Sequence, residues 1–224
     1  MHVCLFDIDG TLIASGGAGK AALEKALATE FGFDHLIEKL QLSGRTDRAI
    51  IRDLFHIHGI HHTSENLQRL LAAYLEHLPG CLSSHHGKVL PGIVLLLEQL
   101  RARGDVAIGL LTGNVREGAR VKLGHFRLFE HFAFGGFGDE HFDRNDVARE
   151  AFQAVERHLG RAAVPERTWV IGDTPLDVRC ARSIGARAVA VATGWHSVKE
   201  LGESKPDLLV ADLSDARAFL AALA

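Results

Sequence analysis

Apolar residues recur along the chain in two rhythms, which predict two kinds of segment. Short β-branched and aliphatic runs alternate with longer segments that carry apolar residues at helical spacing. The predicted strands are Val3–Ile8, Val106–Leu111, Thr168–Ile171, Arg187–Val191 and Leu208–Val210. The predicted helices are Ile93–Arg103, Arg116–Leu123, Asp146–Leu159, Leu176–Ile184, Val198–Gly202 and Asp215–Leu223. This alternation predicts a Rossmann-like α/β fold, with helices on both faces of a parallel sheet.

Between the first strand and residue 89, the helical rhythm runs alone. Three predicted helices fill this part of the chain: Lys20–Phe31, Asp47–His58 and Ser64–Leu78. We therefore expect an α/β core made of residues 1–14 and 89–224, with residues 15–88 inserted as a helical cap. The glycines between residues 15 and 20 are placed to act as a hinge between the two.

Composition and charge narrow the class of protein. The chain has 224 residues, of which 47% are hydrophobic and 24% charged, as expected of a globular protein with a sizeable core. A net charge of −3, without a basic stripe, predicts no nucleic-acid partner. No apolar run approaches the roughly 20 residues that span a bilayer, so no membrane association is expected. Three scattered cysteines and the absence of a leader before the first strand predict a cytoplasmic protein.

The first chemical motif is the run Phe-Asp-Ile-Asp-Gly-Thr, which holds Asp7 and Asp9. If the strand stays extended through Asp9, the two carboxylates point in the same direction. Two carboxylates in one volume favour a bound cation. One of them can then act as a nucleophile while the other transfers protons. The structural alternative is an Asp-Gly turn that closes the strand.

A second motif, Thr112-Gly113-Asn114, follows the predicted strand Val106–Leu111. It supplies a hydroxyl, a backbone amide and a carboxamide at the edge where parallel sheets bind ligands. These donors suit a phosphoryl oxygen, because they add no negative charge. The same residues can also form a turn that caps the next helix.

A third motif places Asp173 and Asp177 after the predicted strand Thr168–Ile171. We expect Asp173 to join Asp7 and Asp9 around Mg²⁺, a hard cation that prefers oxygen ligands. Asp177 would then orient a metal-bound water or a neighbouring side chain. The structural alternative is an N-cap at Asp173 and a surface acid at Asp177.

In this order and spacing, the three motifs resemble the signature of haloacid dehalogenase-like hydrolases. Asp7–Thr11 matches DxDGT, Thr112 matches the threonine that ends a hydrophobic run, and Gly172–Asp177 matches GDTxxD. The resemblance covers essentially the whole chain, and the helical insertion is similar to the family's cap of the first type. Among the branches, the chain most resembles the phosphoglycolate phosphatase and β-phosphoglucomutase group.

The resemblance implies phosphoryl transfer, because dehalogenases lack an acid at the position of Asp9. It implies that Asp7 attacks phosphorus and that Asp9 protonates the leaving alkoxide and later activates water. It also implies that Mg²⁺ contacts Asp7, the Asp9 backbone carbonyl and Asp173.

The resemblance implies functional roles for the positions of two arginines. The family's third motif is usually a lysine, and the alignment puts Arg144 there, with Arg149 as a second contender. Arginine retains the charge and can hold a carboxylate or phosphate with two hydrogen bonds. In the cap, Arg45 resembles part of a specificity loop and is a candidate for an anionic group of the substrate. An ordinary solvent-facing arginine explains Arg45 equally well.

These residues predict a Mg²⁺-dependent phosphatase that acts on a small phosphorylated metabolite, as a monomer or homodimer. One alternative is a phosphomutase of the β-phosphoglucomutase type. The other is a non-catalytic, metal-binding regulatory protein, which Arg144 in the lysine position would favour.

Overall fold

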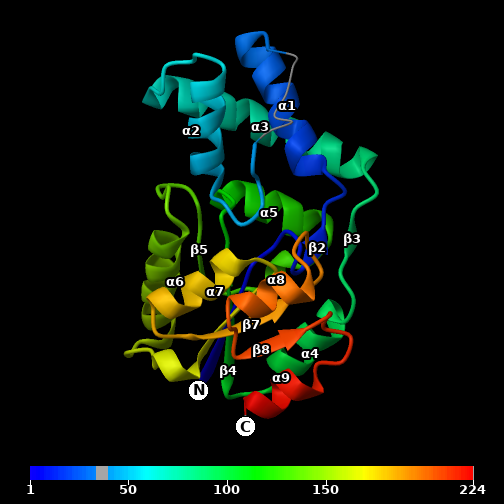
Figure 1. Cartoon of the computed structure of the whole chain (residues 1–224), viewed down its shortest axis with the longest axis vertical. Coiled ribbons are helices and arrows are strands. Elements are labelled where there is room, and N and C mark those ends of the chain that lie inside the picture. The colour runs from blue at the N-terminus through cyan, green and yellow to red at the C-terminus, as the bar shows by residue number, and fades with distance from the viewer. Residues whose placement is uncertain (34–39, 224) are drawn as a thin grey trace.

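A six-stranded parallel sheet forms the centre of the computed structural model, which describes residues 1–33 and 40–223. The strand order is β5-β4-β1-β6-β7-β8, and each neighbouring pair runs parallel. The strands are β1 His2–Phe6, β4 Val106–Leu111, β5 Gly135–Gly136, β6 Thr168–Gly172, β7 Arg187–Val191 and β8 Leu208–Val210. The predicted Rossmann-like core is confirmed (Figure 1).

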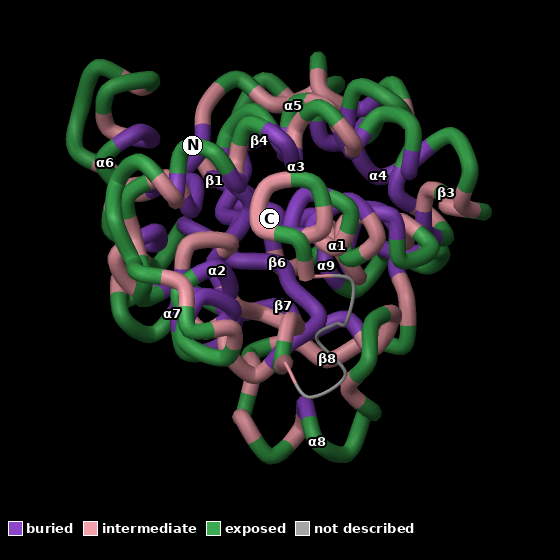
Figure 2. The backbone as a smooth tube through the Cα atoms, turned by 90° about the horizontal axis from the view of Figure 1, so that it is seen from above, coloured by how far each residue is buried: buried purple, intermediate pink, exposed green. Residues whose placement is uncertain are grey.

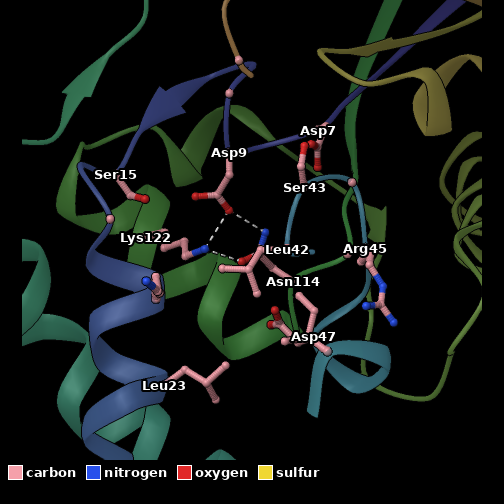
Figure 3. A pocket seen from close by; sticks show the side chains of 18 of the residues that line it. Asp7, Asp9, Ser15, Leu23, Leu42, Ser43, Arg45, Asp47, Asn114 and Lys122 are labelled. Carbon is pink, nitrogen blue, oxygen red and sulfur yellow. Dashed lines mark hydrogen bonds and ion pairs between the residues drawn. The ribbon is translucent and has the colours of Figure 1, made fainter. Parts of the chain in front are cut away.

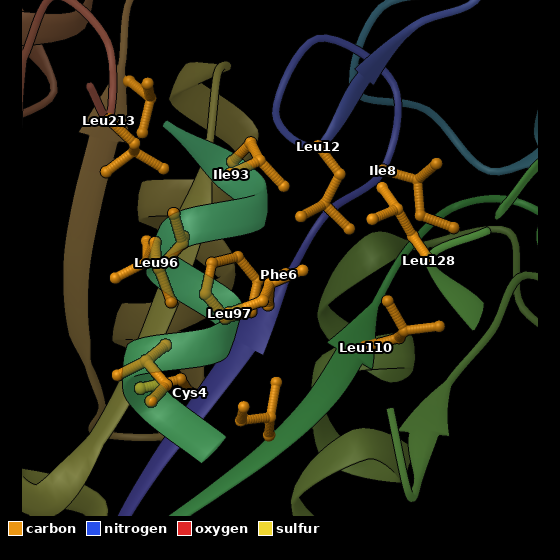
Figure 4. Close-up of a cluster of buried hydrophobic side chains, with 14 of the residues drawn as sticks. Cys4, Phe6, Ile8, Leu12, Ile93, Leu96, Leu97, Leu110, Leu128 and Leu213 are labelled. Atoms are coloured by element: carbon orange, nitrogen blue, oxygen red, sulfur yellow. The ribbon is translucent and has the colours of Figure 1, made fainter. Parts of the chain in front are cut away.

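Helices cover both faces of the sheet because its strands are apolar on both sides. Along β1, Cys4 and Phe6 belong to one buried cluster, while Val3 and Leu5 belong to the other. The first cluster includes residues of α4 Ile93–Ala102, α5 Arg116–His125 and α9 Arg217–Ala222. The second includes residues of α6 Arg144–Leu159, α7 Pro175–Ser183 and α8 Val198–Glu203. Figure 4 draws Cys4 and Phe6 beside α4, and Figure 2 shows the strands buried inside an exposed shell of helices and loops.

Three helices stand apart from the sheet, at the end of the molecule opposite both termini (Figure 1). They are α1 Ala18–Phe31, α2 Asp47–Ile57 and α3 Ser64–Ser84, and they share an apolar cluster that also includes Val115 of the core. Two short antiparallel strands, β2 Ile13–Ala14 and β3 Lys88–Val89, connect them to the core. The predicted cap boundaries fall beside this connection, and residues 34–39 of the predicted cap lie outside the described residues. The division into two domains stays a prediction.

Several strands differ from the sequence prediction, which did not include the short strands β2 and β3. Strand β1 ends at Phe6, because the Ile8 carbonyl accepts turn hydrogen bonds from Thr11, Leu12 and Ile13. The expectation of an extended chain through Asp9 is therefore wrong. The edge strand β5 was not predicted, since its two glycines carry no side-chain pattern.

None of the helices in the described part of the chain has the length and apolar composition needed to cross a membrane.

Candidate active site

Three buried carboxylates converge at the carboxyl edge of the sheet. Asp7 follows β1 and Asp173 follows β6, and the two strands are neighbours in the sheet. Asp177 joins them from the first turn of α7, where its side chain also accepts hydrogen bonds from the Thr174 amide and hydroxyl. One oxygen of each acid lies within 4.8 Å of the others. This is the edge where parallel α/β sheets bind ligands.

Arg144, the first residue of α6, lies between two of these acids. Its Nη2 atom is 2.9 Å from Asp7 Oδ1 and donates to Asp177 Oδ1 at 2.6 Å. The Arg144 side chain is only 5% exposed, and its Nε atom has no hydrogen-bond partner. The other contender, Arg149, is exposed and pairs with Asp146 on the helix surface. Of the two arginines, it is therefore Arg144 that contacts Asp7, and its role in place of a lysine stays a prediction.

Burial and mutual repulsion shift the titration of the acids. Burial, followed by the charges of Asp177 and Asp7, raises the pKa of Asp173 to about 8, although Arg144 opposes the shift. Burial likewise raises the pKa of Asp7 to about 6, against the attraction of Arg144. In the absence of a cation, one guanidinium is therefore not enough to keep the pKa values of these buried acids in their ordinary range.

A divalent cation fits this arrangement. Three carboxylates present the oxygen ligands that Mg²⁺ and similar hard cations prefer. Two glycines allow the chain to pass close to Asp173: a Cβ atom on Gly10 would lie 2.4 Å from Asp173 Oδ2, and one on Gly194 would lie 1.7 Å from it.

Asp9 lies apart from the acid group and belongs to a separate polar network (Figure 3). Lys122 Nζ donates to Asp9 Oδ2 and to Asn114 Oδ1, both at 2.6 Å. Asn114 Nδ2 also donates to Asp9 Oδ2, at 3.0 Å. Burial favours the neutral acid, yet Lys122 and Asn114 together lower the pKa of Asp9 below its ordinary value. The carboxylate is therefore held in its ionised form.

Sequence reasoning missed Lys122. It lies on α5 among the buried positions Gly118, Ala119 and Leu123, which mark the inner face of that helix. A lysine at a core-facing position, eight residues after Asn114, was the available signal. Burial lowers the pKa of Lys122, but the nearby Asp9 charge raises it above its ordinary value, so the side chain stays cationic.

The predicted phosphate-binding residues are tied into the same region. Thr112 is fully buried, and its Oγ1 atom accepts hydrogen bonds from the backbone and side chain of Asn114. The Asn114 side chain is thus committed to Asp9, Thr112 and Lys122, whereas we had expected it to face a phosphoryl oxygen. Gly113 and Asn114 both line the cavity described next.

A cavity of about 770 Å³ lies between the acid group and the cap. The core contributes Asp7, Asp173 and Arg144 to its lining, and the cap contributes both apolar side chains and the polar residues Ser15, Lys20, Ser43, Arg45 and Asp47. The cap loop touches the core directly, because the Asp47 amide donates to the Gly113 carbonyl at 2.8 Å. The cavity is therefore covered on the cap side.

The predicted specificity residue, Arg45, belongs to this cap loop, but its guanidinium is already bonded. Its Nη2 atom donates to Asp53 Oδ2 at 2.6 Å and to the Ala49 carbonyl at 3.3 Å. Its Nη1 atom donates to the Gln41 carbonyl at 3.3 Å. In Figure 3 the guanidinium points away from Asp9.

Comparison with known proteins gives a consistent result. The family model described as haloacid dehalogenase-like hydrolase matches residues 4–182. A phosphoglycolate phosphatase of Synechococcus elongatus is 30% identical, over 96% of this chain and 95% of the relative. Phosphoglycolate phosphatase 1 of Pseudomonas aeruginosa is 28% identical, over 96% of this chain and 78% of the relative.

Solved structures share the fold. A hydrolase from Pseudomonas syringae has a TM-score of 0.75 with 24% identity, and all of both chains is covered. CbbY from Rhodobacter sphaeroides, solved with phosphate, has a TM-score of 0.77 with 18% identity, and 97% of this chain and 96% of that chain are covered.

The chain belongs to the haloacid dehalogenase-like hydrolase family. Within that family its curated relatives carry phosphatase names, and the predicted enzyme class, a phosphatase, is confirmed.

Proposed function

We propose that the protein hydrolyses a small phosphomonoester with Mg²⁺ as its metal and Asp7 as its nucleophile. The observation that carries this proposal is the buried group of Asp7, Asp173 and Asp177, which opens into a covered cavity. The names of the relatives make phosphoglycolate the first substrate to test, with sugar phosphates beside it.

In this proposal the side chains divide the work of two successive displacements. Asp7 attacks phosphorus and forms an aspartyl-phosphate, while the leaving alkoxide takes a proton from Asp9, which must first acquire that proton from solvent because its carboxylate is ionised in the free site. Water then attacks the phosphoryl group, Asp9 accepts its proton, and inorganic phosphate leaves Asp7 unmodified.

The remaining residues hold the reacting groups. Arg144 contacts Asp7 and would balance charge on the phosphoryl oxygens, in the role that a lysine has in the family signature. Thr112 and the Gly113 amide would donate to the phosphoryl group. Asp7, the Asp9 carbonyl and Asp173 would hold the metal, with Asp177 supporting them through Arg144. The bound metal supplies charge neutralisation for the phosphoryl group.

The proposal also includes the domain boundaries and the cellular location. Residues 1–14 and 89–224 form the catalytic core and residues 15–88 the cap, consistent with the apolar cluster that lies mainly on α1, α2 and α3. The three cysteines are free and buried, which supports a reducing, cytoplasmic location.

The test is phosphate release from p-nitrophenyl phosphate and phosphoglycolate, with Mg²⁺ and with EDTA. We expect release that needs the metal and that Asp7→Asn abolishes, while Asp146→Asn on the surface of α6 keeps full activity. Metal-independent release, or full activity of Asp7→Asn, would contradict the proposal.

A further inference from the structure

Each of the three cap helices contributes apolar side chains to the cavity, beside the polar cap residues Ser15, Lys20, Ser43, Arg45 and Asp47. Leu23 comes from α1, Ile50 and Ile51 from α2, and Leu71 from α3. The cap loop adds Leu42, which Figure 3 draws among the lining side chains together with Leu23. The leaving group of a phosphate held at Asp7 would extend into this apolar space.

The cations that line the cavity are already paired. In the described part of the chain, each cationic lining side chain has a carboxylate partner: Lys20 with Glu24 at 3.3 Å, Arg45 with Asp53 at 2.6 Å, Lys122 with Asp9 at 2.6 Å and Arg144 with Asp7 at 2.9 Å. A carboxylate on the leaving group would therefore compete with an existing carboxylate for one of these cations. Such exchanges are unfavourable where the charges are buried, as they are for Lys122 and Arg144.

The cap also contributes a carboxylate to the cavity, where an anionic leaving group would need a cationic side chain. Asp47 lines the cavity, and its Oδ2 atom accepts a hydrogen bond from the Val115 amide at 2.8 Å. A second negative charge on the substrate would meet this carboxylate across the cavity. Charge therefore disfavours substrates that carry a carboxylate on the leaving group, such as phosphoglycolate.

The size of the cavity also disfavours phosphoglycolate as the substrate. The cavity of about 770 Å³ is much larger than the two-carbon remainder of phosphoglycolate requires. Trp195, which follows the close approach of Gly194 to Asp173, lines the same cavity and is 91% exposed. Its indole ring offers a flat apolar face at the mouth of the site.

We propose that this cavity binds the uncharged, apolar alcohol part of an aryl or bulky alkyl phosphomonoester. Leu23, Ile50 and Leu71 form its wall, and Trp195 stacks against the substrate at the mouth. This inference rests on the proposed phosphatase activity and names the substrate class of the same site.

The test compares three alkyl phosphates whose leaving groups differ in polarity and charge: phenylpropyl phosphate, glycerol phosphate and phosphoglycolate. Because all three leave as alkoxides, differences in kcat/KM report mainly on the cavity. We expect phenylpropyl phosphate to exceed phosphoglycolate by at least about tenfold. A preference for phosphoglycolate, or equal values, would overturn the inference and leave the phosphatase activity standing. No hydrolysis of any of the three, nor of p-nitrophenyl phosphate, would overturn both.

Variants of the wall sharpen this comparison. Leu71→Lys places a cation in the cavity, so kcat/KM should fall for phenylpropyl phosphate and rise for phosphoglycolate. Leu75→Lys, one turn further along α3 and outside this cavity, should leave the ratio of the two substrates unchanged. An unchanged ratio in Leu71→Lys would contradict the inference.

A second variant replaces Trp195, whose exposed side chain can be removed without disturbing the fold. Trp195→Ala should raise KM for phenylpropyl phosphate by about two- to tenfold, with a smaller change in kcat. His196→Ala, at the next residue, should leave both constants unchanged. Equal effects of Trp195→Ala on phenylpropyl phosphate and glycerol phosphate would show that the indole does not contact the alcohol.

Discussion

Arg144 owes its importance to the charges packed around it. It is buried against Asp7 and Asp177, and Asp173 lies close to both acids. A buried cation with two carboxylate partners stabilises the fold only while all of them are present, since an unpaired buried charge costs far more than the pair contributes. The same guanidinium can also meet a phosphoryl oxygen, so stability and catalysis are joined at one side chain.

Two substitutions of Arg144 test the role of its charge: methionine removes the charge and lysine keeps it. Arg144→Met should lower the free energy of unfolding by about 3–5 kcal/mol, because two buried acids lose their partner. It should also lower kcat/KM by at least about 100-fold, whereas Arg144→Lys should retain part of both. Chemical denaturation and phosphate-release kinetics measure the two effects. Arg149→Met, in the exposed pair on the same helix, is the control and should change neither; wild-type behaviour of Arg144→Met would refute the assignment.

The raised pKa values of Asp7, about 6, and Asp173, about 8, predict how metal binding depends on pH. Between the ordinary value near 3.8 and these values, the folded protein keeps protons that the unfolded chain has lost. The metal-free protein therefore loses stability as pH rises through this window. A cation must displace those protons, so the rise in Tm caused by Mg²⁺ over EDTA should be larger at about pH 8 than at about pH 5.

Thermal unfolding with Mg²⁺ and with EDTA at both pH values provides this measurement. Asp173→Asn removes the acid with the higher pKa and should flatten the dependence. An equal Mg²⁺ effect on the Tm of the wild type at both pH values would count against a metal site at these acids.

At the scale of elements, the loop after β4 is where the cap meets the core. A Cβ atom on Gly113 would lie 2.1 Å from the Arg45 carbonyl oxygen, so no side chain fits there without moving the cap loop. Gly113 itself accepts a hydrogen bond from Asp47, the first residue of α2. Close backbone contact, more than side-chain packing, thus sets the distance between the cap loop and the acid group.

Gly113→Ala should therefore displace the cap loop and lower kcat/KM by about tenfold or more, because small misplacements at an active site are costly. Gly124→Ala is a matched control in the last turn of α5, where an added Cβ meets nothing within 4 Å. It should leave activity intact and stabilise the helix by about 0.5–1 kcal/mol. Steady-state kinetics and thermal unfolding of both variants decide the matter, and full activity in Gly113→Ala would exclude this role for the loop contact.

The sequence was most informative where a repeating pattern carried the signal. Apolar periodicity located the core strands and all three cap helices, because burial of one face requires it. It failed at β5, where two glycines pair through the backbone alone, and at β1, where a turn at Ile8 ends the strand early. Those boundaries depend on hydrogen bonds that have no side-chain signature.

The site was less predictable than the fold. The motifs identified Asp7, Asp173 and Arg144, which the structure brings together, although their catalytic roles stay predictions. Lys122 was missed because its contact with Asp9 joins residues 113 positions apart. Arg45 was a candidate for contact with the substrate, but its guanidinium donates a hydrogen bond to Asp53 in α2. Sequence spacing cannot reveal such three-dimensional competition for a side chain.

For the whole molecule, two apolar clusters of the core meet one of the cap at a seam that is partly apolar, because the cap cluster also includes Val115 of the core, and partly polar. Across the seam, the Arg48 side chain donates to the Asp139 carbonyl at 2.7 Å and Arg144 donates to the Gly44 carbonyl at 3.3 Å. Polar interfaces between units of one chain commonly permit relative motion. The covered cavity and the glycines at positions 16 and 17, both with positive φ, suit a cap that opens for substrate and closes for reaction.

The measurement that most directly tests this account is detection of a phosphoryl group on Asp7. The enzyme is quenched in acid during turnover of p-nitrophenyl phosphate with Mg²⁺ and analysed by peptide mass spectrometry. We predict a phosphorylated peptide that contains Asp7, labile to hydroxylamine and missing in Asp7→Asn and in EDTA. Rapid turnover with phosphate on another residue, or undiminished turnover by Asp7→Asn, would contradict the central claim that Asp7 is the nucleophile of a metal-dependent phosphatase.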